Sequence, residues 1–179
     1  WDMTILGPVT FAIQHAATIE EALACASRYL FVHSPAMAIS TLKKSPIQPR
    51  LAEMRFEILS PQYAMRQVYD ACLAGVHLFA QALALEHYKL EAVCLPHEPL
   101  ASPDTYSRHY GAPVRVAQTH AALLVSPSTL KVPLRTMSKT LHRLATEYLD
   151  THFPAPGETV TARVRQAISL SLGITPVDK

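Results

Sequence analysis

The stretch RLAEMRFEIL, residues 50–59, decides the fold class, because its side chains alternate between apolar and charged from residue 52 to residue 58. The alternation gives one face of a strand four apolar residues and the other face three charged ones: Ala52, Met54, Phe56 and Ile58 against Glu53, Arg55 and Glu57. Such a pattern is typical of a half-buried strand in an antiparallel sheet. Residues 37–43 (MAISTLK) predict a second strand, which we expect to pair with the first as a hairpin across KSPIQP.

A helix is predicted on each side of this hairpin. The first covers residues 18–33, where Thr18 is the expected N-cap and Glu21 completes a capping box. The second covers residues 62–87, where apolar residues recur at helical spacing and Pro61 suits the first turn. Both helices should turn an apolar stripe toward the sheet.

The second half of the chain predicts alternating short elements. They are a strand at 91–95, a short helix from Ser102 that ends at Gly111, two strands around 114–116 and 121–125, and a helix over 134–152. Together with the first half, these elements predict an α+β fold, with one antiparallel or mixed sheet packed by helices in a single domain.

Composition narrows the class of protein. The 179 residues are 49% hydrophobic and 17% charged, with a formal net charge of +2, which predicts a globular domain without a strongly basic face for nucleic acid. No apolar run approaches the ~18 residues of a membrane span, and we expect no membrane partner. Three cysteines with no CxxC spacing favour a reducing cytoplasm over a disulfide framework.

Motifs for common catalytic chemistry are missing from the sequence. The five glycines are scattered, so no GxGxxG or Walker A loop exists, and neither a GxSxG elbow nor an HExxH pair is present. We therefore expect no metal, no cofactor and no enzyme. An unfamiliar enzyme that uses His97, Glu98 or a cysteine such as Cys72 or Cys94 is the least favoured alternative, because nothing in the sequence predicts an activated nucleophile.

Two features of the helices admit two interpretations each. Arg66 and Asp70 lie four residues apart on the long helix and favour a surface pair, although Arg66 beside Tyr63 and Tyr69 would also suit a bound carboxylate. The helix at 134–152 carries a two-heptad apolar pattern, which favours a core-facing helix but also fits a dimer contact. The residues of that pattern are Leu134, Met137, Leu141, Leu144 and Tyr148.

Three segments in order resemble the AraC/XylS family of transcription regulators, specifically its arabinose-binding-like N-terminal domain. They are LGPVTFAIQHAATIEEALACASRYLFVHSP (6–35), HEPLASPDTYSRHYGAPVRV (97–116) and the terminal LATEYLDTHFPAPGETVTARVRQAI. The resemblance implies an effector-binding and dimerisation domain over residues 1–152, a linker at 153–158, and the start of a helix-turn-helix DNA-binding domain at 159–179. We expect DNA to be bound only through the remainder of that domain, which this sequence does not include.

The resemblance further implies a small-molecule effector and a homodimer. The apolar composition favours an apolar or carboxylated effector of the fatty-acid type. Candidate ligand contacts are Arg55, Arg66, Tyr69, His97 and Tyr106. A protein-interaction module that takes no small molecule is the main alternative. The sequence leaves open whether regulation activates or represses.

Overall fold

The computed structural model describes residues 3–60, 62 and 64–155. Within them, five strands form one open sheet in the order β1-β2-β5-β3-β4. The strands are β1 (Met37–Leu42), β2 (Ala52–Ile58), β3 (Leu90–Cys94), β4 (Val114–Arg115) and β5 (Ala121–Val125). All neighbours are antiparallel except β3 and β4, which run parallel, so the sheet is mixed and the α+β prediction is confirmed.

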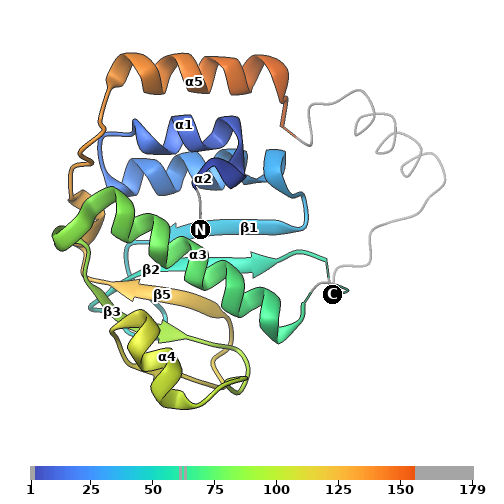
Figure 1. The fold of residues 1–179 in the computed structure, drawn as a ribbon, viewed down its shortest axis with the longest axis vertical. Coiled ribbons are helices and arrows are strands. Elements are labelled where there is room, and N and C mark those ends of the chain that lie inside the picture. The colour runs from blue at the N-terminus through green and yellow to red at the C-terminus, as the bar shows by residue number, and fades with distance from the viewer. Residues whose placement is uncertain (1–2, 61, 63, 156–179) are drawn as a thin grey trace.

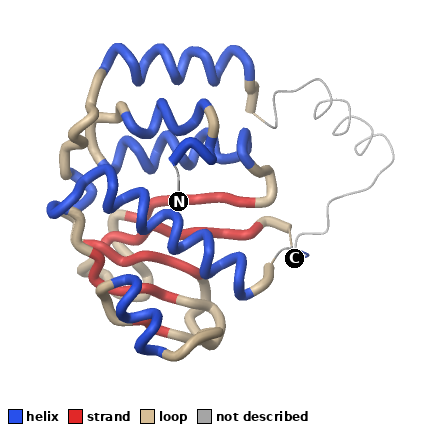
Figure 2. Tube along the Cα trace, in the orientation of Figure 1, coloured by secondary structure: helices blue, strands red, loops and turns tan. Residues whose placement is uncertain are grey.

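Helices cover one face and one edge of this sheet (Figures 1 and 2). They are α1 (Pro8–Gln14), α2 (Ile19–His33), α3 (Arg66–Ala84), α4 (Pro103–Tyr110) and α5 (Lys139–His152), with 3-10 turns at Met3–Leu6 (η1), Leu85–His87 (η3) and Thr129–Lys131 (η4). Figure 1 shows α3 lying across the sheet, α2 alongside β1, and α1 between α2 and the outermost helix α5.

The hairpin and its register follow the sequence prediction. Ile39 of β1 faces Phe56 of β2, and Phe56 in turn pairs with Ala121 of β5. Apolar residues on this face enter the main core, where Met54 is 1% exposed. Burial of an apolar side chain of this size contributes ~1.5–3 kcal/mol, so this face holds β2 against the helices.

The capping prediction for α2 is also confirmed. The Thr18 hydroxyl accepts a 3.2 Å hydrogen bond from the backbone N–H of Glu21. The Glu21 carboxylate reaches back to the N–H of Ala17, one residue before the cap. Together the two bonds satisfy donors that a helix start otherwise leaves unpaired.

Two predicted helix starts are wrong. Helix α3 begins at Arg66 rather than at 62, with Met65 as its N-cap, and Pro61 lies outside the described residues. Helix α5 begins at Lys139 rather than at 134, because residues 133–138 contain a turn and bond to the connection between α1 and α2. In this segment the N–H of Leu134 donates to the carbonyl oxygen of Ala17. The N-cap of α5 is Ser138, whose side chain accepts a hydrogen bond from the N–H of Leu141.

Helix α1 was not predicted from the periodicity of the sequence. A seven-residue helix is too short to show a helical repeat, and it is marginal in isolation. It forms because Val9, Ala12 and Ile13 are buried between α2 and α5. Gly7 precedes it with a φ of 57°, a left-handed conformation that favours glycine.

By length and composition alone, Arg66–His87 is apolar enough to cross a membrane. In the fold, however, its residues Leu73, Ala80 and Leu83 are buried in the core over the sheet. A third of its most apolar 18-residue window is buried inside the fold, and the described residues contain no second helix of that kind.

Candidate functional site

An apolar pocket lies between α2 and α3, above the edge of the sheet at β1 and β2. The pocket encloses about 240 Å³. Helix α2 contributes a stripe along its whole length: Ile19, Ala22, Leu23, Ala26, Leu30 and His33. Helix α3 contributes a facing stripe: Cys72, Gly75, Val76, Phe79, Ala80 and Leu83. Met37, Ile39 and Phe56 form the floor, and η1 and α1 contribute Ile5, Leu6 and Ile13, of which Ile5 is 53% exposed.

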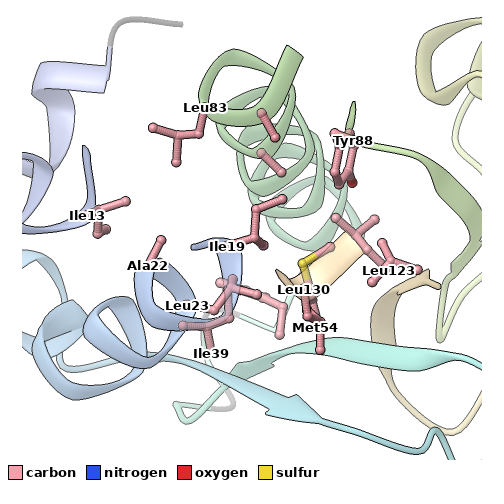
Figure 3. Packing of buried hydrophobic residues seen from close by; sticks show 14 of the residues in the cluster. Ile13, Ile19, Ala22, Leu23, Ile39, Met54, Leu83, Tyr88, Leu123 and Leu130 are labelled. Atoms are coloured by element: carbon pink, nitrogen blue, oxygen red, sulfur yellow. The ribbon is translucent and has the colours of Figure 1, made fainter. Parts of the chain in front are cut away.

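Small residues explain why the two helices leave space between them. Ala26 on α2 and Gly75 and Ala80 on α3 face the pocket with little or no side chain. Protein interiors are otherwise close-packed, so a deficit of side-chain volume along both helices becomes an open space. Figure 3 shows the neighbouring core, with Leu83 of α3 across from Ile13 and Ala22.

The lining residues differ in burial from one end of the pocket to the other. At the inner end, Ile19 is 2% exposed and Leu83 is 8% exposed. Toward the other end, Leu30 and Cys72 are half-buried and His33 is exposed. The Sγ of Cys72 in α3 lies 3.9 Å from the Sδ of Met37, the first residue of β1 after α2. Figure 1 shows α2 and α3 running in opposite directions.

The cysteines support binding rather than covalent chemistry. Burial raises the pKa of the Cys72 thiol, which lines the pocket. Burial likewise raises the pKa of Cys94 to about 11 and that of Cys25 to about 12. A thiol that stays protonated at neutral pH is a poor nucleophile. No group of three or more His, Cys, Asp or Glu side chains that could hold a metal occurs in the described part of the chain.

Three of the predicted ligand residues gather around Asp70, outside the apolar pocket. The Tyr106 hydroxyl donates a 2.5 Å hydrogen bond to Asp70 and accepts one of 3.0 Å from the N–H of Leu100. The Nε2 of His97 lies 3.4 Å from the other carboxylate oxygen of Asp70, an ion-pair distance without hydrogen-bond geometry. The rings of Tyr69 and His97 are 6.2 Å apart.

This cluster changes the interpretation of Asp70. Its carboxylate faces α4 and the loop before it, where we expected a surface pair with Arg66. Burial, and then the hydrogen bond to Asp70, raise the pKa of Tyr106. The cluster therefore fastens α4 to the start of α3. Arg66 itself is exposed at the first position of α3.

Arg55 belongs to a second polar cluster, on the face of β2 opposite the pocket. It donates a 2.8 Å hydrogen bond to Glu53, whose side chain is fully buried. Ser45 donates to the same carboxylate at 2.5 Å, and the Nε2 of His120 lies 2.7 Å from it. Burial raises the pKa of Glu53, but the bonds from Ser45 and Arg55 and the charge of His120 outweigh burial and lower it below the ordinary value.

None of the five predicted ligand residues lines the apolar pocket. Tyr69 does line a second, more polar hollow, together with Pro96 and His120. The sequence signal for the apolar pocket was present in the two apolar stripes, which we interpreted as core faces. The small residues within those stripes were the additional sign.

The predicted dimerisation residues divide into two groups. Leu134 is 4% exposed and packs in the core of this chain. The other four are each about half exposed: Met137, Leu141, Leu144 and Tyr148. Helix α5 instead packs on α1 through another side, where Leu149 is fully buried, and hydrogen bonds from Arg28 and Tyr29 to Asp150 join it to α2. The apolar pattern that favoured a core-facing helix thus lies on the outer surface.

The described residues form an α+β domain with one apolar pocket between two helices, and comparison with known families gives the class of the protein. The chain belongs to the family of arabinose-binding domains found at the N-terminus of AraC transcription regulators, whose sequence profile matches residues 2–134. The individual relatives include the HTH-type transcriptional regulator VirS of Mycobacterium tuberculosis, in two strains, which is 27% identical over 165 residues.

The matched region covers 89% of this chain and 47% of VirS, so the chain spans about half the length of these relatives. Among solved structures, the transcriptional regulator CdpR from Pseudomonas aeruginosa is similar, with a TM-score of 0.71 and 14% identity. That match covers 98% of this chain and 57% of CdpR, and it supports the fold.

Proposed function

We propose that the chain is the effector-sensing part of an AraC-type transcription factor, and that its effector is a small apolar or carboxylated molecule of the fatty-acid type. The observation that carries the proposal is the apolar pocket between α2 and α3. In the whole protein, effector binding would control DNA binding by a C-terminal domain. We further propose a cytoplasmic location and a role without catalysis.

The lining of the pocket favours a hydrocarbon chain over a sugar. Among its eighteen lining residues, His33 is the one with a polar nitrogen in its side chain. A sugar hydroxyl that is buried without a partner costs ~1–3 kcal/mol, whereas each buried CH₂ group contributes ~0.8 kcal/mol. The volume of about 240 Å³ is below the roughly 300–1,000 Å³ common for drug-sized ligands and suits a slender molecule.

We also propose that the chain forms a homodimer through the outer face of α5. Leu141, Leu144 and Tyr148 recur at spacings of three and four residues and are each about half exposed. Exposed apolar side chains that cluster on one helix face mark interaction surfaces, and a two-fold dimer is the commonest closed assembly.

A second candidate function is a protein-interaction module that takes no small molecule. The same exposed face of α5 favours it, because that face exists whether or not the pocket is filled. The two candidates differ in whether the pocket binds a ligand.

The deciding experiment is isothermal titration calorimetry of the chain with decanoate and, separately, with arabinose. We expect decanoate to bind and arabinose to give no heat. Ala26→Phe should abolish decanoate binding because it fills the pocket from α2. Ala24→Phe is the matched control, since Ala24 is exposed on another face of the same helix. If decanoate does not bind the unmodified chain, or binds both variants equally, the effector proposal is rejected and the protein-interaction module is favoured.

A further inference from the structure

The pocket has a direction, because its two ends differ in burial and polarity. At the inner end, Ile13, Ile19 and Leu83 are 2–8% exposed and wholly apolar. At the outer end, His33 is exposed at the last position of α2. An apolar group therefore gains most at the inner end, while a charged or hydrogen-bonding group keeps its contact with water at the outer end.

The pocket is also long and narrow. Its stripe on α2 runs from the first to the last residue of a helix of 15 residues, a length of ~22 Å. The facing stripe on α3 covers about three turns, from Cys72 to Leu83. A channel of this shape between two antiparallel helices accommodates a single extended chain better than a compact ring system.

His33 stands where the head of such a chain would emerge. The side chains around it at the mouth are Leu30, Met37 and Cys72, none of which carries a charge that could hold an anion. The imidazole ring donates a hydrogen bond in either neutral tautomer and carries a positive charge when protonated.

We infer that the pocket binds single-chain carboxylates in one orientation, with the chain end beside Ile19 and Leu83 and the carboxylate at His33. His33 is then the residue that selects an acid over a neutral molecule with the same chain. This inference rests on the proposed function, since it names how the proposed ligand is recognised.

The test compares decanoate with decanol, which share a chain length and differ in the head group. Calorimetric titrations use the full 179-residue chain and two substitutions, His33→Ala and His33→Arg. We expect His33→Ala to weaken decanoate binding about fivefold, as for loss of one charge-assisted hydrogen bond near water, and to change decanol binding less than about twofold. His33→Arg should retain or strengthen decanoate binding.

His87→Ala is the matched control, because His87 is an exposed histidine in η3 and does not line the pocket. It should leave both affinities unchanged, and circular dichroism establishes that each variant is folded. If His33→Ala changes neither affinity, or changes both equally, the orientation is overturned while the proposed function stands. If neither compound binds the unmodified chain, the proposed function is rejected, and the inference about orientation is rejected with it.

Discussion

Tyr29 of α2 donates a 2.7 Å hydrogen bond to Asp150 of α5, and this bond joins the pocket helix to the outermost helix. Arg28 donates a second bond of 2.9 Å to the same carboxylate oxygen, and its guanidinium lies 5.1 Å from the Tyr29 ring centroid. Helix α2 therefore has the pocket on one face and α5 on another. A shift of α2 on ligand binding would reach the proposed dimer surface directly.

The first prediction concerns this link. Tyr29→Phe should destabilise the chain by ~1 kcal/mol, because Tyr29 is 2% exposed and its hydroxyl bonds an acceptor from another helix. Arg28→Ala should cost less, since both members of that ion pair are largely exposed and screened by water. Urea unfolding of both variants and of Asp150→Ala gives the comparison. A larger loss of unfolding free energy for Arg28→Ala than for Tyr29→Phe would contradict the conclusion that the Tyr29 bond is the stronger link between α2 and α5.

The second prediction concerns the dimer surface. Leu144→Lys should convert a dimer to a monomer, because it places a charge at the centre of the exposed apolar face of α5. Leu100→Lys is the matched control: Leu100 is 46% exposed against 50% for Leu144, and it lies in the loop before α4. Analytical ultracentrifugation measures the outcome. A monomeric unmodified chain, or a dimer that survives Leu144→Lys, would rule out this surface.

The third prediction concerns acid stability. Burial, together with the nearby His109, lowers the pKa of His77 to about 4. The unfolded chain binds a proton at His77 near the ordinary value of about 6.5, while the folded chain resists it until about 4. Stability is therefore full above about 6.5 and falls by ~3 kcal/mol as the pH drops to about 4.

The His77 effect can be isolated by substitution. His77→Gln keeps a polar side chain able to meet the Tyr88 hydroxyl, which lies 3.2 Å from the Nδ1 of His77. Urea unfolding at pH 7.0 and pH 4.5, as chosen conditions within that window, should show a smaller acid loss in the variant. Equal losses in the two proteins would mean that His77 is not the titrating group.

The fourth prediction concerns the buried carboxylate. Glu53→Ala should destabilise the chain by roughly 3–5 kcal/mol, because it leaves Arg55 and His120 without their shared partner. Glu57→Ala, an exposed change on the same face of β2, should cost less than about 0.5 kcal/mol. Since the folded pKa of Glu53 lies below its ordinary value, its contribution is present at neutral pH and is lost as the pH falls through that lowered pKa. Chemical denaturation with a pH series measures both effects.

The sequence by itself determined the elements that depend on local pattern. The alternation in residues 50–59 predicted β2 and its apolar face, and the Thr18–Glu21 capping box predicted the start of α2. Gly111, with a φ of 62°, ends α4 as predicted. These features depend on neighbours two to four residues apart, so they can be predicted from the sequence alone.

Only the tertiary structure decided the site, because its parts come from segments distant in sequence. The pocket exists because Ala26 on α2 faces Gly75 and Ala80 on α3, and the spacing of two helices is not a property of either one. Likewise the burial of Glu53 depends on Ser45 and His120, which meet it from two loops. Leu134 joins the core because its segment is held to the α1–α2 connection by a hydrogen bond to Ala17. Local pattern selects which residues avoid water, whereas packing between elements selects which of them touch and where space remains.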